Sequence, residues 1–393
     1  MGGTRLSSVY GLLFGGAGRG VAGDAMVGEN VTRAASRMPI HHFYSTDYEQ
    51  KTGGWIYNRH LIDWLDRHLS GVREITVPVC FPTPDAGVLD EIAALFDEIE
   101  PGAVLLMDHI YGCMLLPILR ERKFRLVLIY HHSMTEERGE GEAATGRDTV
   151  EKSALELAGA IIVTSDKSHA YIASGYGIAD EKIVTAKPGN DPVPQSPAYD
   201  GGPWRMLSVG AVIPRKRYEF LIEALAKIDR SDWSLIIVGN TERYPDYVAS
   251  LQNFIDISGL NNHITLTGEL SPDALEALWQ KAHLYAASSL YEGYGMAISE
   301  ALCRGIPVIS TPSGAVASWA AEVAMLVDAD DPAEIAERIA AMMGDAVAYG
   351  AARERAKNFA AGLPSWEDNM AIAGEAIRRL GVMSETNGSL VRK

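Results

Sequence analysis

Apolar and amphipathic stretches alternate along most of the chain. From Pro39 onward, runs such as RLVLIY (125–130) and AIIVT (160–164) are continuously apolar, which is typical of strands buried on both faces. The stretches between them carry apolar residues three or four positions apart, the period of an amphipathic helix. This alternation predicts an α/β fold in which helices cover both faces of a parallel sheet.

The alternation occurs twice, so the pattern predicts two similar domains. In the first, the expected strands are 41–45, 75–79, 104–107, 125–130, 160–164 and one within 182–186, and the expected helices are 56–69, 89–98, 111–122 and 149–157. In the second, the expected strands are 206–212, 234–238, 263–267, 283–287, 306–309 and 324–327, and the expected helices are 218–228, 272–281, 296–304 and three that begin at 332, 345 and 365. We assign residues 39–195 and 203–364 to the two domains, because the proline-rich segment 192–203 is typical of a linker.

Both ends of the chain lack this periodicity. Residues 1–38 contain nine glycines and four arginines, and we expect them to form a flexible extension, with Met38 as an alternative start. Residues 365–383 begin with Ser365, a favourable helix cap, and predict one more helix. Residues 384–393 follow no pattern and are expected to be disordered.

Composition and charge narrow the choice of function. The 393 residues are 47% hydrophobic, enough for more than one core, and their net charge of -16 argues against a general affinity for nucleic acid. Cys80, Cys113 and Cys303 have no metal-ligand spacing and indicate a reducing, cytoplasmic compartment. No apolar run is long enough to cross a bilayer, so any membrane contact would be peripheral. The basic segment RERKFR (120–125) is a candidate for that contact, and a solvated helix end is the alternative.

The stretch YEGYGMAISEALCRGIPVIS (291–310) concentrates the candidate chemistry. Its apolar spacing predicts a helix that begins after Gly295, so the glycine loop before it would present free backbone N–H groups to an anion such as phosphate. Glu300, inside that helix, can accept hydrogen bonds from two neighbouring hydroxyls of a ribose. Glu292 lies in the loop itself. Two carboxylates eight positions apart are a weak pattern alone, and two solvated acids are the alternative.

Other polar groups follow predicted strands, at the sheet edge where open α/β folds bind ligands. Arg215 and Lys216 come after the first strand of the second domain, where phosphate is their natural partner. The candidates in the first domain are Asp108, His131 and His132 at strand ends, Glu137 in the next loop, and the pair Gly53–Gly54. Structural histidines with hydrogen-bond partners and a tight glycine turn are the alternatives.

The phrase EGYGMAISEAL followed by RGIPVI resembles the donor-site signature of glycosyltransferase family 4, the retaining, nucleotide-sugar-dependent enzymes of GT-B architecture. Ala297 stands where the family often has proline. The resemblance implies two facing Rossmann-like domains with a cleft between them, and a final helix, 365–383, that crosses back to the first domain. The second domain would bind the nucleotide sugar, and the first domain would bind the acceptor.

The resemblance also implies roles for the candidate residues. Glu300 would hold the ribose, Glu292 would lie near the transferred sugar, and the donor would also contact Gly293, Tyr294, Gly295, Met296 and Ala297. Lys216 matches the diphosphate-binding lysine of the family. The family's usual arginine is replaced by Ala211, so either Arg215 takes over its role or the diphosphate is held less tightly. His131, with His132 as the alternative, matches a histidine that faces the sugar, and the acceptor side would include Gly53, Gly54, Asp108 and Glu137.

The expected reaction is transfer of a sugar from a nucleoside diphosphate to a hydroxyl of a carbohydrate or lipid-linked acceptor, with retention, in glycan, polysaccharide or glycolipid synthesis. No metal or other cofactor is expected, because the histidines and cysteines are scattered. A nucleotide-sugar epimerase or hydrolase and a non-catalytic nucleotide-sugar-binding protein are the alternatives. An NAD-dependent dehydrogenase is disfavoured, because no Gly-x-Gly-x-x-Gly follows a predicted strand. We expect the protein in the cytoplasm, with peripheral contact at the inner membrane face as a further expectation.

Overall fold

The structure is a computed structural model that describes residues 39–45, 52–69, 71–77, 84–134, 144–328 and 330–387. For residues 144–147 and 381–387 it describes the backbone only. The predictions for residues 1–38, for Glu137 and for the end of the chain beyond 387 lie outside this described part.

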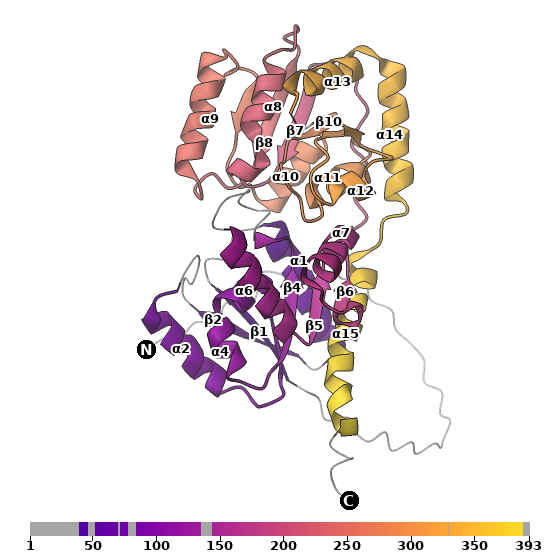
Figure 1. The fold of residues 1–393 in the computed structure, drawn as a ribbon. Helices are drawn as coiled ribbons and strands as arrows, with labels where there is room; N and C mark the ends of the chain where they lie inside the picture. The colour runs from indigo at the N-terminus through magenta and orange to yellow at the C-terminus, as the bar shows by residue number, and fades with distance from the viewer. Residues whose placement is uncertain are drawn as a thin grey trace, which may run out of the picture. The chain divides into compact units, whose positions relative to one another are not determined.

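The first domain is built on a parallel sheet of six strands (Figure 1). The strands are β1 (Ile40–Ser45), β2 (Val72–Val77), β3 (Val104–Asp108), β4 (Arg125–Tyr130), β5 (Ala160–Val163) and β6 (Ile183–Thr185). They lie in the order β2-β1-β3-β4-β5-β6, and every pairing is parallel. The strand order reverses between β1 and β3, so the carboxyl ends of these strands form the switch point at which α/β sheets bind ligands.

Helices connect these strands. They are α1 (Gly53–His68), α2 (Ala86–Asp97), α3 (His109–Met114), α4 (Leu116–Arg120), α6 (Ala144–Leu157), α7 (Asp166–Ala170) and a π-helical turn (Tyr171–Tyr176). The periodicity predicts all of them except the two that follow β5, α7 and the π-helical turn. The single helix predicted over 111–122 is wrong in one respect, because α3 and α4 are separated at Leu115. Pro117 explains the break, since proline lacks the N–H that a continuous helix would use there.

The second domain repeats this plan. Its strands are β7 (Trp204–Val209), β8 (Trp233–Val238), β9 (Ile264–Leu266), β10 (Leu284–Ala287), β11 (Val308–Ser310) and β12 (Met325–Leu326). They lie in the order β12-β11-β10-β7-β8-β9, again all parallel, which places the switch point between β7 and β10. The helices are α8 (Tyr218–Leu225), α9 (Pro245–Ile257), α10 (Pro272–Trp279), α11 (Met296–Cys303), α12 (Val316–Trp319), α13 (Pro332–Gly344) and α14 (Ala346–Ala360).

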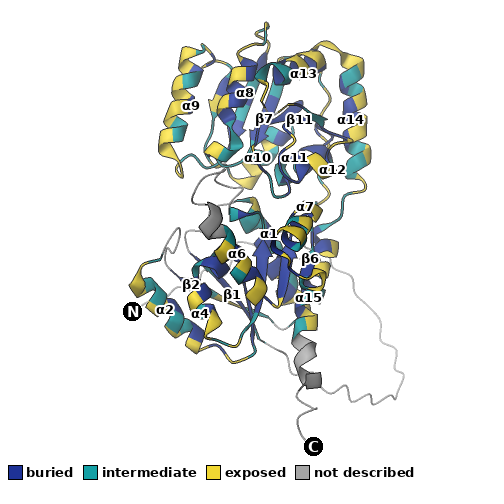
Figure 2. Cartoon of the chain, in the orientation of Figure 1, coloured by how far each residue is buried: buried dark blue, intermediate teal, exposed yellow. Residues whose placement is uncertain are grey.

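Burial follows the predicted periods in both domains. Figure 2 shows the strands mostly buried and the helices exposed along their outer faces. β3 and β10, which are central in their sheets, are buried along their whole length. The apolar runs that predicted parallel strands are therefore the cores of the two domains.

The last helix, α15 (Trp366–Asn387), packs on the first domain beside α1, β5 and β6 (Figure 1). Met370 and Ile377 of this helix are buried in one apolar cluster with Leu61 and Leu65 of α1. The predicted return of the final helix to the first domain is confirmed. The helix continues to Asn387 instead of ending at 383, because the residues added contain neither glycine nor proline.

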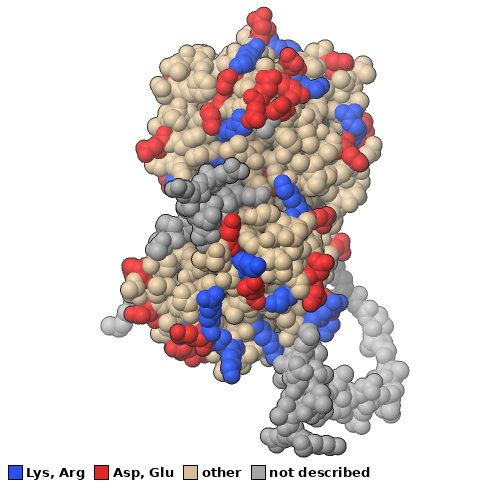
Figure 3. Space-filling model, viewed as in Figure 1, with Lys and Arg blue, Asp and Glu red and all other residues tan. Residues whose placement is uncertain are grey.

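The side chains of Arg122 and Phe124 in the basic segment 120–125 contact the rest of the first domain, while Arg120 and Lys123 are exposed. Arg122 bonds to Asp97 Oδ1 at 2.7 Å and to the carbonyl oxygens of Ala93 and Ile118 at 3.0 Å. Phe124 packs edge-on against Phe96, with 5.7 Å between the ring centroids. On the face in Figure 3, basic and acidic side chains are interspersed. In the described part of the chain, none of the helices combines the length and the apolar character that a membrane span requires.

Candidate functional site

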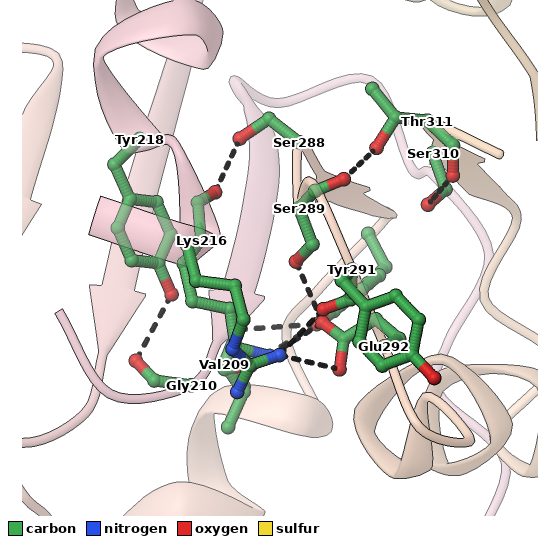
Figure 4. A network of polar contacts seen from close by, with 12 residues as sticks. Val209, Gly210, Lys216, Tyr218, Ser288, Ser289, Tyr291, Glu292, Ser310 and Thr311 are labelled. Atoms are coloured by element: carbon green, nitrogen blue, oxygen red, sulfur yellow. Dashed lines mark hydrogen bonds and ion pairs between the residues drawn. The ribbon is translucent and has the colours of Figure 1, made fainter. Parts of the chain in front are cut away.

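Three charged side chains meet in the second domain, near the carboxyl ends of β7 and β10 (Figure 4). Lys216 Nζ lies 2.5 Å from Glu292 Oε1, and Arg215 Nη1 lies 3.9 Å from Glu292 Oε2. Arg215 also donates to the carbonyl oxygen of Tyr291 at 2.5 Å. Burial alone would raise the pKa of Glu292, but the charges of Lys216 and Arg215 outweigh it and hold that pKa below its ordinary value. The structure thus joins the predicted cations to the first predicted carboxylate.

The backbone after β7 explains how Lys216 reaches this position. A Cβ at Gly210, the first residue after β7, would lie 2.9 Å from Lys216 Cε, so the glycine leaves room for the lysine stem. The next cation, Arg217, has a φ of 54° and stacks its guanidinium over the Phe220 ring, 3.9 Å from the centroid. Of three consecutive basic residues, two therefore face Glu292 and the third packs elsewhere.

Hydroxyl groups fix the backbone around this cluster (Figure 4). Ser289 Oγ donates to Glu292 Oε1 at 2.6 Å, and Thr311 Oγ1 donates to the carbonyl oxygen of Ser289 at 2.6 Å. Ser288 Oγ donates to the carbonyl oxygen of Lys216 at 3.0 Å. These bonds tie the Glu292 loop to the segment that carries the cations and to the end of β11. The sequence reasoning missed these serines, although their place directly after β10 was a usable signal.

The segment after β11 packs on the backbone of Glu292. The N–H of Ala315 donates to the carbonyl oxygen of Glu292 at 2.9 Å. A Cβ at Gly314 would lie 2.1 Å from the same oxygen, and Gly314 has a φ of 55°, a left-handed conformation that favours glycine. The two glycine-containing loops can therefore lie in direct contact only because this position lacks a side chain.

The glycine loop opens α11 as predicted. Gly295 caps the helix with a φ of 95°, and Met296 and Ala297 form its first turn. The ring of Tyr294 stacks on Trp319 with 5.1 Å between the centroids and is only 6% exposed. The side chain of Tyr294 belongs to the core, so only its backbone remains for the donor contact that the resemblance implies.

Glu300 lies in α11, half-buried, and its carboxylate forms no hydrogen bond or ion pair with any residue of the described ranges. Burial raises its pKa to about 7, with a smaller contribution from Glu276, although the charge of Arg304 opposes the rise. Interior carboxylates normally have a partner, because withdrawing a charge from water is costly. The role of Glu300 in binding a ribose stays a prediction.

We expect Glu300→Gln to weaken binding of a nucleoside diphosphate by roughly 1.5 to 3 kcal/mol at pH 8, the value of hydrogen bonds to a charged group. Calorimetric titration measures this loss. Glu337→Gln, which removes an exposed carboxylate from α13, is the matched control and should bind as the native chain does. Unchanged affinity in Glu300→Gln would remove this residue from the donor site.

The raised pKa also predicts a pH dependence. Below about pH 7 Glu300 is protonated, so it loses one acceptor and donor affinity should fall between pH 8 and pH 6. Because the folded-state pKa lies above the ordinary 4.5, the free energy of unfolding contributed by this group should decrease as the pH rises from 4.5 to about 7. Calorimetry and urea titrations at several pH values check both trends, which Glu300→Gln should abolish.

In the first domain, two predicted residues meet a third that the sequence reasoning missed. Asn58 Nδ2 donates to Asp108 Oδ1 at 2.8 Å, and His131 Nε2 lies 3.1 Å from Asn58 Oδ1 and 3.3 Å from Asp108 Oδ1. Asp108 ends β3 and His131 follows β4, while Asn58 comes from α1. Asn58 was detectable as a polar residue at a buried position of an amphipathic helix.

The segments that carry these residues approach the glycine loop of the second domain. A Cβ at Gly293 would lie 2.0 Å from the carbonyl oxygen of His131, and a Cβ at Gly53 would lie 3.2 Å from Met296 Sδ. The rings of His132 and Tyr291 lie 6.2 Å apart. The structure therefore brings together most of the candidates from both halves of the chain.

The pair Gly53–Gly54 corrects one expectation. The sequence predicted a loop there, but the two glycines form the first turn of α1, and the Thr52 hydroxyl accepts a hydrogen bond from the N–H of Trp55. A threonine cap can start a helix at glycine because it satisfies one of the free N–H groups of the first turn. The glycines thus place a helix N-terminus, instead of a loop, near Met296.

No group of three metal-ligating side chains occurs among the described residues. The prediction of metal-free chemistry overlooks one Asp-x-Asp sequence, 328–330, which metal-dependent sugar transferases often use. Asp328 Oδ1 accepts a hydrogen bond from the N–H of Asp330, and the neighbouring Asp331 caps α13. These contacts assign the acidic segment a local structural role, and the absence of a metal requirement stays a prediction.

The second half of the chain is similar to known glycosyl transferases. Residues 191–361 match the family model described as "Glycosyl transferases group 1". The lipopolysaccharide core biosynthesis mannosyltransferase LpsB of Rhizobium meliloti is 33% identical over 144 residues, covering 33% of this chain and 40% of that protein. A GDP-mannose-dependent alpha-(1-6)-phosphatidylinositol monomannoside mannosyltransferase of Mycobacterium tuberculosis is 29% identical over 161 residues, covering 37% and 41%. The chain thus spans less than half the length of these relatives.

The likeness to solved structures extends over both domains. Sucrose-phosphate synthase from Thermosynechococcus elongatus superimposes with a TM-score of 0.75 over 88% of this chain and 99% of that chain, at 20% sequence identity. The segment that matches the family model includes Lys216, Glu292 and Glu300. The chain therefore has the GT-B fold of two Rossmann-like domains, and its second half matches the group 1 glycosyl transferases.

Proposed function

We propose that the protein is a retaining glycosyltransferase of family 4 that moves a sugar from a nucleoside diphosphate to a hydroxyl acceptor. One observation carries this proposal: the unpaired carboxylate of Glu300 lies on the helix whose preceding loop holds Glu292 against Lys216 and Arg215. Glu300 would thus accept hydrogen bonds from the ribose, and the two cations, which come from a second loop 76 residues away, would bind the diphosphate next to it. The match of residues 191–361 to the group 1 glycosyl transferases supports the same reading.

Lys216 and Arg215 would stabilise the charge that develops when the diphosphate leaves. Both are held in place by the Glu292 loop, so they would need little reorganisation during the reaction. Binding of a diphosphate requires these cations to exchange at least part of their contact with Glu292 for phosphate oxygens. Glu292 would then be available to hydroxyl groups of the sugar, next to the positive end of α11.

The course of the reaction follows from the residues available. In the described part of the chain, the carboxylate of the cluster, Glu292, is held by Lys216 and Ser289, and we do not assign it as a nucleophile. We assign attack from the face that the diphosphate leaves, with a phosphate oxygen accepting the acceptor's proton. His131, held by Asn58 and Asp108, would orient the sugar or the acceptor hydroxyl. The proposal has four further parts: the acceptor is a carbohydrate or is lipid-linked, the chemistry needs no metal, the protein is cytoplasmic, and its membrane contact is peripheral.

A panel of UDP-, GDP-, ADP- and dTDP-sugars tests the proposal. We expect one of them to raise the melting temperature, because a ligand that binds only the folded state stabilises it. Incubation of that donor with oligosaccharide and lipid-linked acceptors should yield a product whose anomeric configuration, read by NMR, equals that of the donor. No stabilisation by any nucleotide sugar would reject the donor site. Epimerised or hydrolysed donor without transfer would reject the transferase activity, and an inverted product would reject retention.

A further inference from the structure

A buried carboxylate lies beneath the acceptor-side candidates of the first domain. Glu151 is in α6 and its side chain is fully buried. It is surrounded by residues of the apolar core that includes Tyr130, Cys113 and Ala154. Glutamate is rarely found at such a position unless several polar groups compensate for the lost water. The polar contacts of Glu151 therefore indicate its structural role.

Both oxygens of Glu151 accept hydrogen bonds from segments at the carboxyl edge of the sheet. Oε1 lies 3.2 Å from His109 Nε2 and 3.4 Å from the backbone nitrogen of Met134. Oε2 accepts from the Tyr176 hydroxyl at 2.9 Å and from Ser133 Oγ at 3.4 Å. Burial alone would raise the pKa of Glu151, but the contacts with His109, Tyr176 and the Met134 N–H outweigh it and hold the pKa below its ordinary value.

The segments that Glu151 ties together carry the candidate site residues. His109 directly follows Asp108 at the end of β3, and Ser133 directly follows His131 and His132 after β4. The Glu151 carboxylate thus holds the residues that directly follow Asp108 and the two histidines in the chain. Placement of such groups to within about an ångström has large effects on rate, on the order of 100-fold.

We infer that Glu151 is a positioning residue that holds His131 and Asp108 in the geometry needed for transfer, without touching donor or acceptor itself. The inference rests on the proposed glycosyltransferase function for its kinetic consequences. A carboxylate suits the role, because each of its two oxygens accepts a hydrogen bond from a different segment. A glutamine offers one acceptor oxygen, so its NH2 group would face either the Met134 N–H or the Tyr176 hydroxyl.

Glu151→Gln tests this inference, with Glu156→Gln as the matched control. Glu156 lies on the same helix and is exposed, and its carboxylate lies 3.9 Å from Lys152 Nζ. We expect Glu151→Gln to lower kcat for transfer at least tenfold per folded molecule, with Kd for the nucleoside diphosphate changed less than twofold. The proposed donor-binding residues lie in the second domain. A role of Glu151 confined to the first domain should therefore lower kcat and leave Kd unchanged. Glu156→Gln should change neither quantity.

A second readout does not depend on activity. The ring nitrogens of His131 should give one set of NMR signals in the native chain and in Glu156→Gln, and shifted or multiple signals in Glu151→Gln. Native-like signals together with native kcat in Glu151→Gln would overturn the inference, and so would an equal loss of donor affinity. If Glu151→Gln does not fold, Tyr176→Phe removes the 2.9 Å bond to Glu151, together with a 3.5 Å contact to Asp148, and should show the same pattern to a smaller degree.

The same design separates this inference from the proposed function. A native chain that binds no nucleotide sugar would reject the proposed function, while the His131 signals would still report whether Glu151 positions the histidine. A native chain that transfers sugar, combined with native kcat and native signals in Glu151→Gln, would reject only the role of Glu151.

Discussion

Replacing Lys216 by alanine is expected to lower kcat by about 100-fold or more, the usual cost of losing one preorganised charge-stabilising donor. The interaction of Lys216 with the diphosphate would strengthen as the sugar–phosphate bond breaks, so turnover should suffer more than ground-state donor binding. Initial rates with saturating donor, together with calorimetric Kd for the nucleoside diphosphate, separate the two effects.

Arg215→Ala shows whether this residue fills the role vacated at Ala211. The structure places Arg215 on the Tyr291 backbone and near Glu292, with its side chain 16% exposed, so it does not point to solvent. We therefore expect Arg215→Ala to lower kcat nearly as much as Lys216→Ala does. Adding Ala211→Arg to the Arg215→Ala protein should restore part of the lost kcat. Arg217→Ala is the matched control, because this neighbouring cation packs on Phe220, and its kcat should change less than twofold. Native kcat in Arg215→Ala would reject the substitution of roles.

Gly314→Ala is expected to damage both stability and turnover. A Cβ would lie 2.1 Å from the carbonyl oxygen of Glu292, so one of the two loops must move. A residue other than glycine in the left-handed conformation of Gly314 costs about 1 to 3 kcal/mol even without the collision. Displacement of Glu292 would also disturb Lys216, and we expect kcat to fall on the order of 10-fold or more. Urea unfolding and initial rates measure the two effects.

Gly350→Ala provides the control for this glycine. Gly350 lies inside α14, and a Cβ there would meet no atom within 4 Å. The same chemical change should therefore stabilise the protein by roughly 0.5 to 1 kcal/mol, because alanine suits a helix interior better than glycine. Native stability and native kcat in Gly314→Ala would show that the loops are not packed as described.

The sequence predicts the fold well because parallel strands and amphipathic helices have different periods. All twelve strands in the described part overlap predicted runs, although β2 begins three residues before its run and β7 two residues before its own. α9 was missed, although Pro245 at its start and apolar residues at Val248, Leu251 and Ile255 give the helical spacing. The polar residues on either side of α9 made its helical spacing hard to recognise, and the segment contains no known motif.

The candidate site could be predicted only in part. Motifs placed Lys216, Glu292 and Glu300 at strand ends or on the helix that follows, which is a property of position along the chain. The pairing of Lys216 with Glu292 depends on how two loops 76 residues apart meet, and no local pattern encodes that. Glu151 was invisible for a related reason, because an acid on a surface helix and an acid under a sheet edge look alike in one sequence.

The packing of α15 on the first domain also has a consequence for how the protein is made. The core that contains Leu61 and Leu65 is closed by Met370 and Ile377, which a ribosome adds some three hundred residues later. Domains usually fold in order of synthesis, the N-terminal one first. Here the first domain must wait with an open apolar face until the last helix emerges, so the second domain can finish folding before the first.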